Sequence, residues 1–377
     1  MRNSQKGFTL VEIMVALVIG LIAMVVVMQV FNLSETRKRS TTGGSDAQAN
    51  GAVSFFMIER DVKMAGWGLD TGAYRNCTNI KSYCNGSASC GGGTGTIAGL
   101  SFASVQITDG ASGGPDTVTA QFFSNPASET YRVPAVSVLK SPLTMPADDI
   151  TATSVAGCAV GDLILLQEPT SSPNAGQCSL VQATTVTPAT LKIQHDTTGP
   201  FNPSAAEQLA GNWTKHVANA SMACIKKPVD GPFFKRTYAI DTAQRALTRS
   251  DNSGATVQTN EVVTPEIVDM QAQYGIAPAN SQVINQWVDA TTTWVSPSMV
   301  DIKRIKAVRI ALLARSAQYE KPVNSTTACV STTDAMAAKW STWATFKTSA
   351  YPADWHCYQY KSFETVIPLR NVIWSNL

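Results

Sequence analysis

The sequence predicts an α+β fold in which a long N-terminal α-helix packs on a large, mainly antiparallel β-sheet head. Three observations lead to this prediction. The chain opens with a long apolar run, Phe8–Phe31, and a second helical pattern extends from Asp46 to about Ala65. From Thr117 to the end, short strand-like runs follow one another without helical segments between them, which disfavours a parallel-sheet enzyme fold.

The first apolar run is long enough to cross a membrane. As an α-helix, Phe8–Phe31 would span about 36 Å, more than the roughly 30 Å of a bilayer core. A polar leader with Arg2 and Lys6 precedes the run, and no small-residue cleavage site follows it, unlike in an ordinary secretory signal. Because basic residues stay on the cytoplasmic side, we expect everything after Phe31 to be exported.

Glu12 is the anomaly in this run. A carboxylate in a lipid-spanning helix is costly unless it finds a partner. No Lys, Arg or His lies between Phe8 and Phe31, so we expect the partner on another molecule. If cleavage after Gly7 frees the amine of Phe8, each neighbouring subunit offers one positive charge at matching depth, and Glu12 can pair with it as the helices bundle.

The run Lys6-Gly7-Phe8-Thr9-Leu10-Val11-Glu12 resembles the prepilin signal of type IV pilins and type II secretion pseudopilins. The resemblance implies that a prepilin peptidase cuts between Gly7 and Phe8 and methylates Phe8, and that Glu12 acts in assembly. The residues expected to pack between helices are Leu10, Val11, Ile13, Leu17 and Leu21. The alternative, a plain signal-anchor helix, leaves Glu12 and the Gly-Phe junction unexplained.

We expect four segments along the chain: a cleaved leader at 1–7, the transmembrane and assembly half of the helix at 8–31, its periplasmic half at 32–66, and a globular head at 67–377. Paired glycines each cost about 1 kcal/mol in a helix, so Gly43-Gly44 predicts a kink. In the second half of the helix, the 3–4-residue spacing of apolar side chains predicts one buried face and one solvent-exposed face. The buried face is Phe55, Ile58, Val62 and Ala65, and the solvent face is Glu59, Arg60, Asp61 and Lys63.

Strand-like runs fill the head after a loop region, residues 70–115, that is rich in Cys, Gly and Ser. Ile267–Ile276 alternates cleanly, whereas Ile305–Ala314 is continuously apolar and should be a buried central strand. Asp241–Gln244 is a hairpin signal between two runs. The expected strands are Thr117–Phe123, Asp162–Gln167, Ser179–Val186, Leu191–His195, Phe234–Ile240, Arg245–Arg249, Ile267–Ile276, Ile305–Ala314, Phe363–Val366 and Val372–Trp374.

The cysteines all follow the membrane run and therefore share one compartment. They contain no C-x-x-C and no zinc-like spacing, and their even number in loop-like sequence favours structural disulfides in an oxidising space. A mixture of free thiols and one or two bridges is the alternative, and eight cysteines leave 105 pairings open. The disulfide candidates are Cys77, Cys84, Cys90, Cys158, Cys178, Cys224, Cys329 and Cys357.

Four landmarks resemble PilW-type minor pilins: Arg60–Gly66, Val268–Gly275, Val308–Ser316 and Phe363–Asn371. The resemblance implies a minor pilin that primes a type IV pilus, sits at its tip and supports motility and adhesion. It implies contact with other minor and major pilins and with an inner-membrane assembly platform, and it allows a tip adhesin as a further partner. Before assembly the chain would cross the inner membrane once with its head periplasmic, and afterwards it would lie on the pilus and cell surface.

Composition and motifs give no sign of catalysis or of nucleic-acid binding. The net charge is only +2, and removing Arg2 and Lys6 with the leader lowers the basic residues from 29 to 27, equal to the 27 acidic ones. His195, His216 and His356 are scattered without metal-ligand spacing. We therefore expect no cofactor, no metal site and no enzyme activity.

Two features of the head have open interpretations. Asp109 and Asp116 bracket a Gly-rich loop that could bind calcium, although a solvated turn is the favoured interpretation. A group of aromatic residues, flanked by two cysteines, is either a partner-binding patch or, as we favour, a disulfide-framed core. The group comprises Trp340, Trp343, Phe346, Tyr351, Trp355, Tyr358 and Tyr360.

Three functions remain open on the sequence alone: a PilW-type minor pilin, a minor pseudopilin of a type II secretion system, and a single-pass anchored protein or enzyme without a fibre role. The last predicts no leader cleavage. Subunit order in the tip and the ligands of the head are not encoded in any pattern that we can identify.

Overall fold

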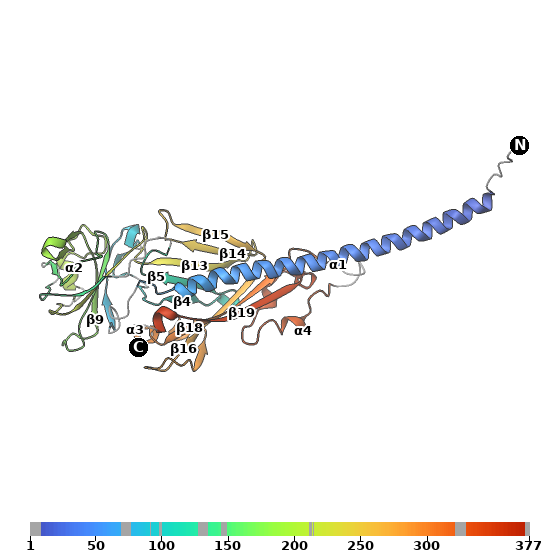
Figure 1. The fold of residues 1–377 in the computed structure, drawn as a ribbon. Helices are drawn as coiled ribbons and strands as arrows, with labels where there is room; N and C mark the ends of the chain where they lie inside the picture. The colour runs from blue at the N-terminus through green and yellow to red at the C-terminus, as the bar shows by residue number, and fades with distance from the viewer. Residues whose placement is uncertain are drawn as a thin grey trace.

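The computed structural model describes residues 9–68, 77–90, 92–97, 100–126, 135–144, 149–210, 213, 215–320 and 329–373. It consists of one long helix and a head with two lobes (Figure 1). The proximal lobe lies against the helix, and the distal lobe lies beyond the carboxyl end of the helix (Figure 1). The prediction of a long N-terminal helix on a mainly antiparallel β head is confirmed.

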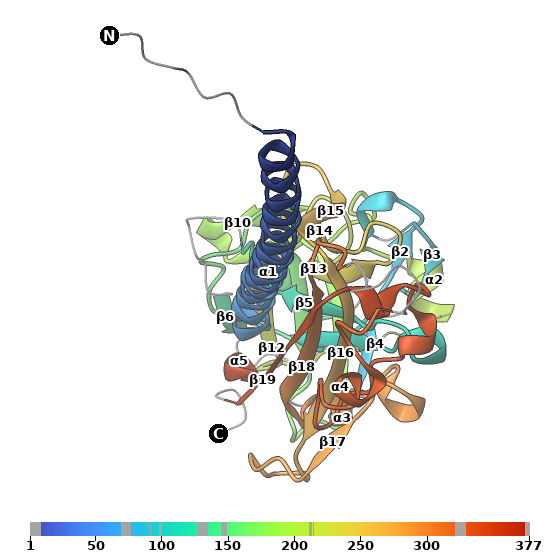
Figure 2. The same ribbon diagram turned by 90° about the vertical axis from the view of Figure 1, so that its right-hand side faces the viewer.

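Helix α1, Leu10–Met64, is continuous over 55 residues and curves gently towards the head (Figures 1 and 2). The kink predicted at Gly43-Gly44 is wrong. A Cβ at Gly43 would lie 3.1 Å from the Cβ of Ser316, and one at Gly44 would lie 3.1 Å from Oε1 of Gln359. These glycines therefore bring the helix close to the head, and packing offsets their low helix propensity.

Two antiparallel sheets and α1 form the proximal lobe. The strands of the first sheet, in spatial order, are β15 (Gln258–Pro265), β14 (Ala246–Asp251), β13 (Phe234–Asp241), β5 (Thr117–Phe122) and β4 (Val105–Thr108). Those of the second are β17 (Gln286–Val288), β16 (Ile267–Ile276), β18 (Ile305–Arg315) and β19 (Tyr360–Pro368). Strand β18 is internal and buried on both faces, as its apolar run predicts.

The core of the proximal lobe lies between the two sheets and one face of α1. Ile58, Val62 and Ala65 contribute from the helix, as their spacing predicts, and Phe55 packs on the edge of this core. Short helices complete the lobe: α3 (Met299–Ile302), α4 (Asp334–Ala337) and α5 (Arg370–Ile373). The strand predicted at Val372–Trp374 is wrong, because Pro368 ends β19 and the chain turns into α5; Trp374 itself lies outside the described residues.

The distal lobe is a second β unit with its own cores. Its main sheet has the order β1 (Asn79–Lys81), β9 (Gln177–Gln182), β8 (Leu163–Gln167), β12 (Ser221–Ile225) and β6 (Ala135–Val138). A smaller sheet has the order β10 (Thr185–Thr187), β11 (Lys192–Gln194) and β7 (Ile150–Thr151), and a hairpin joins β2 (Cys84–Asn85) to β3 (Thr94–Gly95). Helix α2 spans Ala205–Ala210. The predicted run Ser179–Val186 is divided between β9 and β10.

Strand pairing shows how the distal lobe joins the head. Strands β5 and β13 are hydrogen-bonded neighbours, with Phe122 opposite Phe234. The residues between these two strands, 123–233, supply most of the distal lobe. The distal lobe is therefore largely an insertion between two adjacent strands of the proximal lobe.

Candidate assembly surface

The apolar half of α1 stands free of the head. Every side chain from Leu10 to Leu33 is exposed, and the most apolar 18-residue window of the helix has a mean hydropathy of 3.0. Among the described residues, α1 is the helix long and apolar enough to span a membrane. The five predicted packing residues, Leu10, Val11, Ile13, Leu17 and Leu21, are 52–75% exposed. A continuous apolar surface of this size requires a covering of lipid or of other helices.

Glu12 lies at the start of this surface and has a partner that the sequence reasoning missed. Its Oε2 accepts hydrogen bonds from the backbone N–H and the hydroxyl of Thr9, both at 2.9 Å, and its own N–H donates to Thr9 Oγ1. This is a reciprocal capping box, and the Thr-x-x-Glu spacing could have predicted it. The carboxylate still meets no positive charge in the described part of its own chain.

A shallow, mainly apolar groove runs along the helix beside Glu12. It is lined by Glu12, Ile13, Ala16, Leu17, Gly20, Leu21 and Met24. A Cβ at Gly20 would meet no atom within 4 Å, so this part of the helix is open to close approach by a neighbour. The predicted cleavage site, Gly7 and Phe8, and the basic Arg2 and Lys6 lie outside the described residues.

A buried charge cluster fixes the other half of α1 to the head. Asp61 has no exposed surface, so its expected place on the solvent face is wrong. It accepts hydrogen bonds from Arg236 Nη1 at 3.1 Å and from the Tyr238 hydroxyl at 2.6 Å, and Arg236 Nε donates to Asp251 at 2.8 Å. Burial, together with the Asp61 carboxylate, raises the pKa of Tyr238, so the phenol stays protonated and donates.

The spacing of the helix contained a signal for this cluster. Asp61 lies three residues after Ile58 and one before Val62, and so falls within the predicted buried stripe. We predicted an exposed Asp61 because the residue is charged, although its position in the helix indicated burial. A buried carboxylate at such a position indicates an oppositely charged partner on the facing element.

Two further contacts complete the attachment of α1. A Cβ at Gly51 would lie 2.0 Å from the ring of Phe363 on β19, so the ring sits directly against the helix backbone. The side-chain amide of Asn371 donates to the carbonyls of Met64 and Ala65 at the end of α1, where the Met64 carbonyl also accepts from the N–H of Trp67. The C-terminal segment thus caps the helix on which it packs.

All eight cysteines are paired in the structure. Three disulfides stabilise the distal lobe and its junction, Cys77–Cys178, Cys84–Cys90 and Cys158–Cys224. The fourth, Cys329–Cys357, closes the aromatic segment of the proximal lobe. The pairings could not be derived from the sequence, because they join residues as far as 101 positions apart.

Ser179, His216 and Glu168 form a Ser-His-Glu arrangement in the distal lobe. His216 Nδ1 lies 2.8 Å from Glu168 Oε1, and His216 Nε2 lies 2.9 Å from Ser179 Oγ. All three residues are at most 1% exposed, so the serine hydroxyl is inaccessible to a substrate. The arrangement joins β8, β9 and the segment before β12 as a buried polar network.

The loop between Asp109 and Asp116 is closed by backbone contacts. The two oxygens of Asp116 accept from the N–H groups of Gly110 and Ala272 at 2.8 and 2.7 Å, and the residue is 3% exposed. The expected solvated turn is therefore wrong at Asp116. Burial raises the pKa of its carboxyl to about 6. The described residues contain no group of three or more potential metal-ligating side chains.

Most of the aromatic group forms the disulfide-framed core that we favoured, and Trp343 lies partly exposed at its edge. Trp340, Phe346 and Trp355 are at most 9% exposed and pack on Ala311 and Leu313, on the face of β18 that points away from α1. Nδ1 of His356 lies 2.7 Å from the carbonyl oxygen of Thr332.

Comparisons with known proteins give two family matches. Residues 237–371 match PilW, the type IV pilus-assembly protein W, and residues 2–28 match the prokaryotic N-terminal methylation motif. The curated proteins gave no match. Among solved structures, the chain resembles a type IV-like pilin from Thermus thermophilus at 12% identity, over 57% of this chain and 87% of that one, with a TM-score of 0.20 that is too low to carry an argument.

The PilW match coincides with the part of the head that holds the helix. Tyr238, Ser316, Phe363 and Asn371 all contact α1 and all lie within residues 237–371. The methylation motif implies processing by a prepilin peptidase and assembly with other pilins, and the apolar helix behind it is suited to inner-membrane anchoring before assembly. Over residues 237–371 the chain belongs to the PilW family of type IV pilus-assembly proteins, and residues 2–28 carry an N-terminal methylation motif.

Proposed function

We propose that the chain is a non-enzymatic minor pilin that primes a type IV pilus, is incorporated at its tip and supports motility and adhesion. One observation carries this proposal: the N-terminal, apolar half of α1 is exposed, whereas its C-terminal half packs on the part of the head that matches PilW. PilW-family proteins are typically structural subunits. Cleavage between Gly7 and Phe8 and pairing of Glu12 with the Phe8 amine of a neighbour belong to the same proposal.

The distal lobe supports the tip position. It lies beyond the carboxyl end of α1, opposite the assembly half of the helix (Figure 1). In a fibre built on parallel helices, a subunit stacked above this one would clash with the distal lobe. At the tip no subunit lies above, so the lobe fits there without a collision.

The topology follows from the same features. Before assembly the head would be periplasmic and the N-terminus cytoplasmic, and the four disulfides suit that oxidising compartment. The partners would be other minor and major pilins, the inner-membrane assembly platform and a tip adhesin.

The test is a deletion strain, examined with and without the retraction motor. We expect surface pili to be lost, and to return in part when retraction is absent, because a priming subunit promotes assembly without forming the shaft. Normal pili with exoproteins trapped in the periplasm would contradict the proposal and indicate a minor pseudopilin of type II secretion instead.

A further inference from the structure

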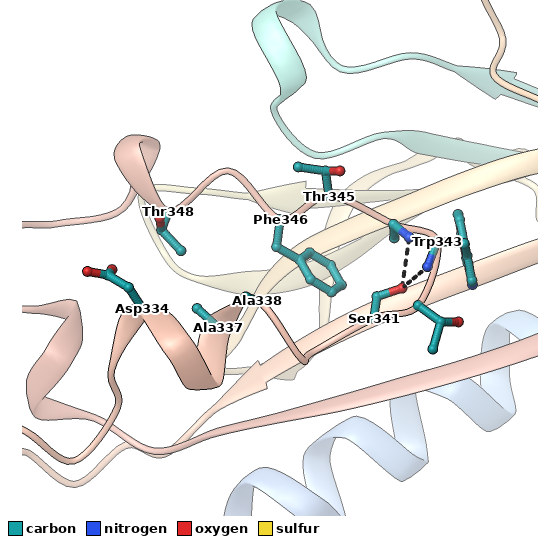
Figure 3. A pocket seen from close by; sticks show the side chains of 10 residues that line it. Asp334, Ala337, Ala338, Ser341, Trp343, Thr345, Phe346 and Thr348 are labelled. Atoms are coloured by element: carbon teal, nitrogen blue, oxygen red, sulfur yellow. Dashed lines mark hydrogen bonds between the residues drawn. The ribbon is translucent and has the colours of Figure 1, made fainter.

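A groove of about 420 Å³ lies on the proximal lobe between α4 and the loop that follows it. Figure 3 shows Asp334 at one end, Trp343 at the other and the Phe346 ring between them. The volume falls in the range of small-ligand sites. Nothing in the assembly surface of α1 uses this groove.

The walls of the groove are held in place by contacts on every side. The Cys329–Cys357 disulfide closes the segment, and Trp340 and Trp355 pack beneath it. Lys347 Nζ donates to the carbonyl of Ser112 at 2.6 Å, and the Tyr351 hydroxyl donates to Asp269 at 2.7 Å. A loop pinned in this way presents a fixed surface, and a fixed surface loses less entropy on binding.

Trp343 is oriented before any ligand arrives. The Arg309 guanidinium lies 4.4 Å from the Trp343 ring centre and 4.9 Å from that of Trp287, and Gln273 fixes the guanidinium through Nε at 2.8 Å. Ser341 Oγ accepts from the N–H groups of Trp343 and Ala344 (Figure 3). The indole is therefore held by Arg309 over one face of its ring and through its backbone.

The chemistry of the lining selects the ligand class. Besides the indole N–H, its polar side chains are four hydroxyl groups and one carboxylate, with no Lys or Arg among the ten lining residues, and the nearby Arg309 guanidinium is engaged by Trp343, Trp287 and Gln273, so the lining favours a neutral ligand over an anion. The partly exposed Trp343 ring offers a flat apolar surface, and the edge of the buried Phe346 ring forms part of the floor. Rings beside hydroxyl groups suit a molecule with apolar C–H faces and many hydroxyls. The hydroxyl-bearing residues are Ser341, Thr342, Thr345 and Thr348.

We propose that this groove binds a neutral oligosaccharide, with the indole of Trp343 stacking on a sugar ring and the threonine hydroxyls and Asp334 bonding its hydroxyl groups. Asp334 and Trp343 lie at opposite ends of the lining (Figure 3), so a ligand that contacts both would be a short chain of sugars rather than a single ring. The site goes beyond the fibre role and does not depend on it.

The test uses the purified full chain in a detergent without sugar headgroups. Neutral hexasaccharides of glucose, mannose and N-acetylglucosamine are probed by saturation-transfer NMR and calorimetry. We expect at least one of them to bind, and Trp343→Ala to weaken it about tenfold, the value of one good aromatic contact. Trp343→Phe should restore part of the affinity, and Trp67→Ala, which removes an exposed indole elsewhere, should leave it unchanged.

A second variant keeps the test valid if Trp343→Ala fails to fold. Thr345→Arg adds bulk to the groove from an exposed position without removing core atoms, and should also abolish binding. The proposal is overturned if none of the hexasaccharides binds at millimolar concentration, if only charged oligosaccharides bind, or if affinity is the same in Trp343→Ala and Thr345→Arg as in the unmodified chain.

Discussion

Two acidic residues of α1 have opposite surroundings. Asp61 is buried between Arg236 and Tyr238, so its charge is neutralised within the subunit. Glu12 is exposed in the apolar half, and its contact in the described residues is the neutral Thr9. One carboxylate thus joins helix to head, and the other, in the assembly that we propose, keeps its charge for a neighbouring subunit.

Replacing Asp61 by Asn should destabilise the attachment of the helix. The change removes one charge of a buried pair and leaves Arg236 with Asp251 alone, so we expect a loss of about 3 kcal/mol in the free energy of unfolding. Urea unfolding of the purified chain measures it. The matched control is Glu59→Gln, which breaks the half-exposed pair with Lys63 and should cost less than about 0.5 kcal/mol. Equal losses would contradict the role of Asp61.

Asp116 should make the head less stable as the pH rises. Burial raises the pKa of its carboxyl from 3.8 to about 6, so the folded chain binds the proton more tightly than the unfolded chain does. The contribution of this group to stability therefore falls between pH 3.8 and about 6. Unfolding curves across this window should show a flatter pH dependence in Asp116→Asn. An unchanged slope would mean that the group titrates alike in both states.

At the scale of the element, α1 depends on glycines where it meets the head. We expect Gly51→Ala to destabilise the chain by about 1–2 kcal/mol, because the added methyl would meet the Phe363 ring at 2.0 Å, despite the better helix propensity of Ala. Gly20→Ala is the control, since its methyl meets nothing within 4 Å. Thermal unfolding should show the first variant below, and the second at or above, the unmodified chain.

The disulfides of the distal lobe should differ in importance. Removing Cys77–Cys178 by paired Ser substitutions opens a loop with a sequence separation of 101, which also contains β4 and β5 of the proximal lobe, and we expect a loss of about 4 kcal/mol in the free energy of unfolding. Removing Cys84–Cys90, with a separation of 6, should cost clearly less. Hydrogen exchange measures the loss of amide protection in each of the two variants. Equal losses of protection in the two variants would contradict this dependence on loop length.

The elements that the sequence predicts best are those set by a local period. Ile267–Ile276 is a strand with the bounds expected from its alternation, and Ile58 and Val62 face the core as their spacing indicates. The errors arise where a distant contact decides. The helix continues through Gly43 because it packs there against Ser316, which follows β18. Asp61 is buried because Arg236, far along the chain, lies opposite and pairs with it.

At the scale of the whole molecule, the chain is a pilin-like unit with an additional lobe. The proximal lobe and α1 form a closed core, and residues 123–233 extend it between the neighbours β5 and β13. Both family matches lie outside this insertion. The insertion was not predictable, because its strands have the same local pattern as those of the proximal lobe, and only pairing between β5 and β13 distinguishes the two.

The candidate site was only partly predictable for the same reason. The exposed helix half and Glu12 follow from the first residues of the sequence alone. The groove beside Trp343 requires the Cys329–Cys357 closure and the stacking of Arg309 from another strand, and neither follows from the order of residues.

The most direct test of the central claim, that Glu12 joins subunits through its charge, compares Glu12→Gln with Glu12→Ala. Gln keeps an oxygen that can accept from Thr9 and so preserves the capping box, but it removes the charge. Glu35→Ala, which breaks an exposed pair with Arg39 in the same helix, is the control. Each variant is expressed in the deletion strain, and processed chain is quantified in membranes and in sheared fibres. We predict that both Glu12 variants are cleaved and remain in the membrane while Glu35→Ala enters fibres. Normal incorporation of Glu12→Gln would contradict the account, because the cap alone would then suffice.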